Sequence, residues 1–172
     1  PPTKPATTST PKPSSQWLAP THLQPSSPPT SPLPTNLTPA LTALQQHLTT
    51  VQLPLSSYKL TDGSGLSRHN LAAPNTLTLL LQSFTDNRPF RDSLPHSGGP
   101  GSLKTRFLQY PGQIQAKTGY LTGALALSGY TKPTIGQPRI FSILLNHSQL
   151  PVLTQRNAID TVATAILTTD CP

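Results

Sequence analysis

Hydrophobic residues recur along this sequence with two periods, and each period predicts one kind of secondary structure. Apolar residues three and four positions apart predict amphipathic helices within residues 38–51, 72–86 and 156–170. Thr38 is the expected N-cap of the first helix, and Pro74 is the expected start of the second. The residues expected to face the core are Leu41, Leu44 and Leu48 in the first helix, Leu77, Leu80, Leu81 and Phe84 in the second, and Ile159, Val162, Ala163, Ile166 and Leu167 in the third.

Three other segments follow the strand pattern. They are residues 56–63, 113–131 and 139–147, and the last is so nearly all apolar that we expect it to be buried. Residues 87–102 are rich in Gly and Pro and predict a connection between elements. The order of helices and strands predicts an α+β fold, in which helices pack on a mostly antiparallel sheet.

Residues 1–37 differ in composition from the rest of the chain. They hold half of the 22 prolines, Ser and Thr make up much of the remainder, and no hydrophobic period is present. Such a segment cannot bury enough apolar surface to offset its conformational entropy. We therefore expect a disordered Pro-rich linker or tail over residues 1–37 and a folded domain over residues 38–172.

The charge pattern argues against a dedicated nucleic-acid surface. The chain has 12 Lys and Arg against 5 acidic residues, yet only 10% of its residues are charged and 5% are aromatic. Nucleic-acid surfaces normally need clustered cations, often with stacking rings, and no run of Lys or Arg occurs here. A diffuse positive field suits anionic wall polymers or lipid headgroups equally well.

Neither a cofactor nor a metal site is expected. The single cysteine, Cys171, excludes an intrachain disulfide and a multi-cysteine metal site, and the five histidines lack metal-ligand spacing. No apolar run is long enough to cross a bilayer, so we expect no transmembrane segment. The sequence starts at Pro1 without a signal peptide.

Two short motifs carry candidate chemistry. The sequence AKTGYLTGALALSGY places Lys117 at the head of an alternating strand, and DGSGLSRHN, residues 62–70, precedes it in the chain. Each is weak alone: Lys-Thr-Gly is a common tripeptide, and the glycine-rich turn lacks the third glycine of a dinucleotide fingerprint. Together and in this order they match two elements of a serine acyl transferase, which combines S-x-x-K, S-D-N and K-T-G.

On these motifs the chain resembles the C-terminal part of the D-alanyl-D-alanine carboxypeptidase/endopeptidases, the class C low-molecular-mass penicillin-binding proteins. The resemblance covers residues 38–168 and includes LPHSGGPGSLKTRF, IFSILLNH and the last helix with Asp160. It implies the C-terminal portion of a penicillin-binding-protein/β-lactamase-like transpeptidase domain. It also implies cleavage of D-Ala-D-Ala in peptidoglycan stem peptides through an acyl-enzyme, with β-lactams as mimics. The implied location is the bacterial periplasm or the extracytoplasmic face of the cell envelope.

The resemblance also implies roles for individual residues. Ser67 is similar to the second-motif serine, which relays a proton between the catalytic lysine and the leaving amine. Asn70 is similar to the residue that holds the substrate amide, although the spacing from Ser67 is one residue longer than S-x-N. The strand then supplies Lys117 and Thr118 for the substrate carboxylate, Gly119 for close approach of the peptide, and the Tyr120 backbone N–H for the oxyanion hole.

The nucleophile of the first motif has no convincing counterpart. Ser9–Lys12 matches S-x-x-K literally but lies in the Pro-rich segment, and Ser56–Lys59 lies on the expected strand 56–63, where residues three apart point to opposite faces. The family carries S-x-x-K far upstream, so the chain is interpreted as a C-terminal fragment that is inactive alone. A non-catalytic remnant that binds wall peptides is the alternative, and a basic adaptor for polyanions is a weaker third hypothesis.

Overall fold

The computed structural model describes residues 38–169, which contain four α-helices and five strands. In chain order they are α1 (Thr38–Thr50), a 3-10 turn (Leu55–Ser57), β1 (Tyr58–Lys59), β2 (Leu71–Ala72), α2 (Pro74–Ser83), α3 (Arg88–Asp92), β3 (Ile114–Leu121), β4 (Ala124–Thr131), β5 (Ile140–Asn146) and α4 (Val152–Thr168). The predicted Pro-rich segment, residues 1–37, lies outside the described residues, as does Cys171. The predicted α+β class is confirmed.

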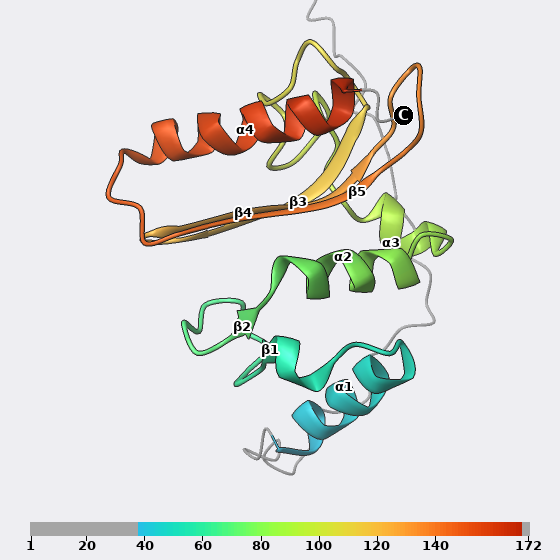
Figure 1. Cartoon of the computed structure of the whole chain (residues 1–172), viewed down its shortest axis with the longest axis vertical. Coiled ribbons are helices and arrows are strands. Elements are labelled where there is room, and N and C mark those ends of the chain that lie inside the picture. Colours follow the sequence, from blue (N-terminus) through green and yellow to red (C-terminus); the bar gives the residue numbers. More distant parts are fainter. Residues whose placement is uncertain (1–37, 170–172) are drawn as a thin grey trace, which may run out of the picture. The chain divides into compact units, whose positions relative to one another are not determined.

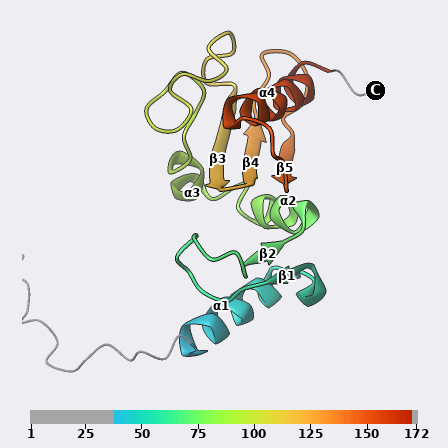
Figure 2. The same ribbon diagram turned by 90° about the vertical axis from the view of Figure 1, so that its left-hand side faces the viewer.

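The main sheet is an antiparallel meander in the order β3-β4-β5 (Figure 2). β3 and β4 form a hairpin whose two-residue turn, Thr122–Gly123, has Gly123 at φ 77°, a left-handed conformation that glycine adopts without strain. The sequence predicts residues 113–131 as strand, and the structure divides them at this turn. β4 is the central strand and is the most buried of the three.

Helices cover both faces of this sheet. α4 packs on β4 and β5 from one side, and α2 packs on the same two strands from the other (Figure 1). The larger core lies under α4 and contains Leu103, Phe107, Ile114, Ala116, Leu125, Leu127, Phe141, Ile159, Ala163 and Leu167. A smaller core of Leu81, Leu94 and Tyr130 lies on the α2 side. The sheet is therefore packed between two apolar layers.

The α2 side of the sheet is organised around Tyr130. Its hydroxyl donates to the Leu81 carbonyl at 2.6 Å, and the Arg91 guanidinium lies 4.1 Å from the centre of its ring. Burial raises the pKa of Tyr130, and the positive charge of Arg91 partly offsets that rise. Arg91 belongs to α3, a short helix capped by Asn87 within the segment that the sequence predicted as a plain connection. That prediction was wrong because Asn87 and the following prolyl turn supply a local helix start.

Two predictions about burial were also wrong. β5 was expected to be buried, but only Phe141 is buried and most of its other residues are half-buried, because β5 forms an edge of the sheet instead of its centre. Val162 was expected on the core face of α4, yet its side chain is 47% exposed, and Gln155 takes a buried place on that helix instead. Helix periodicity locates an apolar stripe but does not say how much of the stripe the rest of the fold covers.

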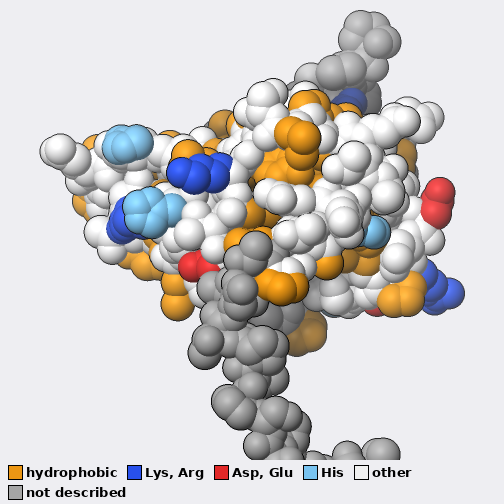
Figure 3. Space-filling view, turned by 90° about the horizontal axis from the view of Figure 1, so that it is seen from below, with side chains coloured by type: hydrophobic (Ala, Val, Ile, Leu, Met, Phe, Trp, Pro, Cys, Tyr) orange, Lys and Arg blue, Asp and Glu red, His pale blue; other side chains and the backbone are white. Residues whose placement is uncertain are grey.

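Outside the cores the described surface is only sparsely charged. On the face shown in Figure 3, hydrophobic side chains are interspersed with uncharged polar ones, and Lys, Arg and His side chains lie at both ends of the view. Leu55, Leu66 and Leu71, all between α1 and α2, are among the exposed large hydrophobic residues. No helix in the described part of the chain is long and apolar enough to span a membrane.

Candidate active site

The outer edge of β3 is bonded at one end by a neighbouring loop. Ala116 N–H donates to the Pro95 carbonyl at 2.9 Å, and Ser97 N–H donates to the Ile114 carbonyl at 2.8 Å. The even-numbered residues of β3 therefore direct their main-chain groups to this outer edge, and the odd-numbered ones bond β4.

The same alternation leaves the other end of that edge open. Thr118 and Tyr120 are even-numbered, so their N–H and C=O groups face outward, beyond the loop that covers Ala116. Among residues 38–169, no main-chain hydrogen bond from another segment reaches either of them. An extended peptide could pair with β3 here, as an added strand does.

A cation and a hydroxyl lie at this open edge. The Lys117 ammonium is exposed and donates to the Thr118 carbonyl at 2.8 Å, while Thr118 is half-buried. Gly119 comes next, directly opposite Ala126 of β4. The structure thus brings together Lys117, Thr118, Gly119 and Tyr120, as the continuous strand requires.

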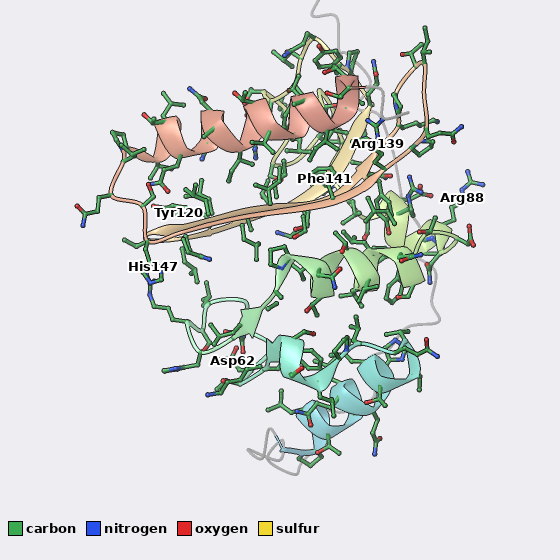
Figure 4. All side chains as sticks on the ribbon, viewed as in Figure 1. Asp62, Arg88, Tyr120, Arg139, Phe141 and His147 are labelled. Carbon is green, nitrogen blue, oxygen red and sulfur yellow. The ribbon has the colours of Figure 1, made fainter. Side chains whose placement is uncertain are left out.

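A small polar hollow of about 170 Å³ adjoins this edge. Tyr120 lies at the end of the sheet near the start of α4, on the same end as His147 (Figure 4). The walls are formed by Thr118, Gly119, Tyr120, Leu125 and Ala126 of the hairpin, Arg156 and Ile159 of α4, and Ser102, Thr105 and Arg106 of the preceding loop. Arg156 therefore adds positive charge beside the strand, which the sequence motifs did not indicate.

Arg106 is held by an ion pair with Asp160 of α4. The Arg106 Nε lies 3.1 Å from Asp160 Oδ1 and 3.2 Å from Oδ2, and a second guanidinium nitrogen also donates to Oδ1. The two side chains are 11% and 24% exposed. Two-pronged contact of this kind fixes the guanidinium plane, so the pair ties the loop under the hollow to α4.

Asn70 braces the loop that precedes β2. Its side-chain oxygen accepts the N–H groups of Thr61 at 2.6 Å and Asp62 at 3.2 Å. Its side-chain nitrogen donates to the main-chain carbonyl of Asp62 at 3.0 Å and to its carboxylate at 3.1 Å. All four hydrogen-bonding positions of the amide are used within the loop. The predicted substrate role of Asn70 stays a prediction, and it requires some of these bonds to open.

Asp62 also forms hydrogen bonds within this loop. Its carboxylate accepts the Ser64 hydroxyl at 2.8 Å and the Ser64 N–H at 3.0 Å. These two bonds, followed by that from Asn70 and the charge of His69, lower the pKa of Asp62. The carboxylate is thus a structural acceptor within the loop.

Ser67 belongs to the loop before β2 and lines a hollow together with the turn of the β3–β4 hairpin. Its hydroxyl oxygen accepts the His69 N–H at 3.2 Å, and the neighbouring Arg68 donates to the Thr122 carbonyl at 2.8 Å. Ser67 and Asn70 line a separate hollow of about 420 Å³ that does not include Thr118 or Tyr120. The structure therefore brings Ser67 to the same end of β3 as the Lys-Thr-Gly motif, but into an adjacent hollow. Arg68 was missed as a site residue, although it directly follows Ser67 in the motif.

The S-x-x-K match within residues 38–169, Ser56–Lys59, does not form a catalytic pair. Ser56 lies in the 3-10 turn and Lys59 in β1, so they share neither a helix nor a strand face. The expectation that both belong to one strand was wrong in detail. The other match, Ser9–Lys12, lies outside the described residues. Within residues 38–169, no group of three or more His, Cys, Asp or Glu side chains is placed to hold a metal ion.

Comparison with known proteins identifies the family that carries these motifs. The model of the D-Ala-D-Ala carboxypeptidase 3 (S13) family matches residues 30–166, which is most of the chain. This chain belongs to that family. A carboxypeptidase DacB from Mycolicibacterium smegmatis is 33% identical over 143 residues, which cover 77% of this chain and 30% of that protein. A D-alanyl-D-alanine carboxypeptidase from an Actinomadura species is 33% identical over 130 residues, which cover 69% and 24%.

A solved structure shows the same fold for this member of the S13 family. Penicillin binding protein 4 from Haemophilus influenzae, in complex with a β-lactam, superimposes with a TM-score of 0.67 at 24% identity, over 78% of this chain and 34% of that one. The chain spans about a third of the length of the curated relatives that it matches. The predicted resemblance to the C-terminal part of these peptidases is confirmed.

Proposed function

We propose that this chain supplies the substrate-docking edge of a serine-type D-Ala-D-Ala carboxypeptidase/endopeptidase, which acts on peptidoglycan stem peptides outside the cytoplasm. The observation that carries the proposal is the open outer edge of β3, where Lys117, Thr118 and the Tyr120 N–H come together. Family membership and the names of the relatives support the substrate class.

The edge suits a peptide that ends in a carboxylate. The Lys117 ammonium and the Thr118 hydroxyl offer a charge and a donor to the terminal carboxylate of D-Ala-D-Ala. Gly119 adds no side chain between the strand and the peptide. The peptide main chain would pair with the outward groups of β3, which orients the scissile bond along the strand.

Tyr120 would act through its main chain. Its outward N–H donates to the scissile carbonyl oxygen, and more strongly to the oxyanion that forms when a serine oxygen attacks that carbon. One such donor is worth about 3 kcal/mol of transition-state stabilisation. The C–N bond then breaks, the leaving D-Ala amine takes a proton, and water later hydrolyses the ester. β-Lactams share the reacting amide and the nearby carboxylate, so the same groups would bind them.

Ser67 is the proposed proton relay for that leaving amine. Its oxygen already accepts the His69 N–H, so its own proton remains available to a second acceptor. Catalysis also needs the serine and lysine of an S-x-x-K motif, and Ser56 and Lys59, the match within residues 38–169, share neither a helix nor a strand face. We therefore expect the chain by itself to remain unacylated.

A non-catalytic wall-peptide-binding module is the alternative. The observation that favours it is that Ser56 and Lys59, the S-x-x-K match within residues 38–169, do not form a serine–lysine pair, while the outer edge of β3 is open. Such a module would bind D-Ala-D-Ala peptides through Lys117 and Thr118 without cleaving them.

The two functions separate in one experiment. A chimera would join the part of the M. smegmatis relative that this chain does not match to residues 38–172 of this chain. The peptidase account predicts a covalent band with fluorescent penicillin for the chimera and none for the chain alone. A chimera with native-like circular dichroism but no band would contradict it. A band on the chain alone, mapped to Ser56, would contradict the expectation that Ser56 is not the nucleophile.

A further inference from the structure

A polar hollow lies between α3, the start of β3 and the end of β4, and we call it the α3 hollow. Its volume is about 410 Å³, and its charged lining residues are Asp86, Arg88, Arg91, Asp92, His96 and Lys132. Gln115 of β3 also lines it, whereas no residue of the Lys-Thr-Gly motif does. Figure 4 shows Arg88 on the opposite side of the view from Tyr120 and His147. The docking edge therefore does not account for this hollow.

Arg91 is held in one orientation at this hollow. Its guanidinium lies 4.1 Å from the centre of the Tyr130 ring, and its Nε and one terminal nitrogen each donate to the Gln115 side-chain oxygen at 3.3 Å. The Gln115 side-chain nitrogen donates back to the Arg91 carbonyl at 2.5 Å. A planar guanidinium fixed by an aromatic ring and an amide is pre-organised, so it loses little side-chain entropy when it binds a ligand.

The charge of Arg91 has no anionic partner among residues 38–169. The ion pairs of this part of the chain are Arg88–Asp92 and Arg106–Asp160, and neither includes Arg91. The side chain that accepts from its guanidinium, Gln115, is a neutral amide. A guanidinium is suited to a carboxylate or a phosphate, because its fork of N–H groups matches two oxygens. Its second terminal nitrogen is therefore left to donate to an anion in the hollow.

Two further groups add positive charge to the lining. Lys132 forms no ion pair in the described part of the chain. The His96 imidazole lies beside Gly99, where a Cβ would come within 2.0 Å of its Nε2, so glycine at this position leaves room for the ring. Outside the α3 ion pair, the lining holds Arg91 and Lys132 against the single carboxylate of Asp86, and a protonated His96 adds to the positive excess.

We propose that the α3 hollow binds a phosphate group. A phosphate group carries up to two negative charges and presents oxygens in several directions, so it can meet the Arg91 guanidinium and the Lys132 ammonium together. A carboxylate has one charge and two oxygens, which Arg91 alone would occupy. The phosphate can belong to a soluble phosphate ester or to an anionic lipid headgroup, since both present the same chemistry to the hollow. The inference rests on the geometry of the hollow and does not depend on the proposed peptidase activity.

NMR titration of the chain with inorganic phosphate tests the site directly. The Nε–H of Arg91 and the main-chain N–H of His96 should show saturable shifts, while the N–H groups of Thr118 and Tyr120 should not. Phosphate should bind at least about tenfold more tightly than acetate at equal ionic strength, because it makes one more charge-assisted hydrogen bond. Shifts that do not saturate, or equal affinity for acetate, would overturn the proposal.

Gln115→Glu tests the unpaired charge of Arg91 and leaves its stacking partner Tyr130 in place. The introduced carboxylate should pair with the guanidinium at the position of the present amide oxygen, and phosphate affinity should then fall at least about tenfold. Gln109→Glu, at an exposed position outside the lining, is the charge-matched control and should leave the affinity unchanged. Equal losses in the two variants would overturn the site. If Gln115→Glu lowers the unfolding midpoint, Arg91→Lys decides, and unchanged affinity in that variant would overturn the site as well.

The source of the phosphate group is tested with lipid vesicles. With a lipid headgroup as the source, the chain should sediment with phosphatidylglycerol vesicles but not with phosphatidylcholine vesicles, and inorganic phosphate should release it. Saturable phosphate binding without sedimentation would support the site and assign a soluble phosphate ester as the source. Sedimentation that phosphate does not reverse, and that Gln115→Glu and Gln109→Glu weaken equally, would place the anion-binding surface elsewhere and overturn the proposal.

Discussion

Gly119 of β3 and Ala126 of β4 face each other directly, and a Cβ placed on Gly119 would lie 3.1 Å from the Ala126 Cβ. This separation is tighter than ordinary van der Waals contact, so the strands themselves favour glycine at position 119. The proposed docking of a peptide at the same strand gives a second, independent reason for glycine.

A compensating substitution separates these two reasons. Gly119→Ala should lower the free energy of unfolding by about 1–3 kcal/mol through overpacking, and adding Ala126→Gly should restore most of it. Urea denaturation of the chain measures both. In the chimera, the double variant should still label poorly with penicillin, because the added methyl remains in the path of the peptide. Full recovery of labelling would mean that Gly119 serves sheet packing alone.

Asn70 is expected to hold the 61–70 loop in shape. Asn70→Ala removes the acceptor of the Thr61 and Asp62 N–H groups, at a cost of about 1 kcal/mol per lost bond. Amide exchange at these two residues should accelerate. Asn157→Ala, at an exposed position of α4, should leave them unchanged. Unaltered exchange in the Asn70 variant would show that water replaces the side chain without loss.

The same loop should respond to acid. Hydrogen bonds from Ser64 lower the pKa of Asp62 in the folded state below its unfolded value of 3.8. The associated stability is therefore present above pH 3.8 and is lost as the pH falls through the folded pKa. The NMR signal of the Ser64 N–H should titrate with that lowered pKa, and Asp62→Asn should abolish the titration. A titration midpoint at or above 3.8 would contradict the assignment.

The sequence predicted much of this fold because its signals are local. The start of α2 at Pro74 follows from a residue that acts within one turn of itself, whereas the hairpin turn at Gly123 divides a segment that the sequence predicts as one strand. Strand pairing is not local: IFSILLN shows the same apolar pattern at the centre or at the edge of a sheet, and only the order β3-β4-β5 places it at the edge.

The candidate site likewise has a part that the sequence predicted and a part that it did not. Lys117, Thr118, Gly119 and Tyr120 are adjacent in sequence, so a single strand brings them together. Arg106 and Asp160 are 54 residues apart, and no local pattern indicates that they pair. The bracing role of Asn70 likewise depends on side-chain orientation within the loop, which its spacing from Ser67 does not specify.

The Arg106–Asp160 pair should couple the loop before β3 to α4. A double-mutant cycle with Arg106→Ala and Asp160→Ala should give a coupling energy of about 1–3 kcal/mol in thermal or urea unfolding. The exposed pair Arg88–Asp92, whose atoms lie 3.6 Å apart, is the control and should give about 0.5 kcal/mol or less. Equal coupling in the two cycles would show that partial burial adds nothing to the Arg106 pair.

The most direct test of the docking edge is penicillin acylation of the chimera with Lys117→Ala. Loss of a charge-assisted bond to the carboxylate is worth roughly 1.5–3 kcal/mol, so the second-order acylation rate should fall about ten- to a hundredfold while the unfolding midpoint stays unchanged. Lys132→Ala, just beyond the end of β4 and also exposed, should leave the rate near that of the parent. Equal and negligible effects of the two substitutions in an active chimera would contradict the assignment of β3 as the substrate edge.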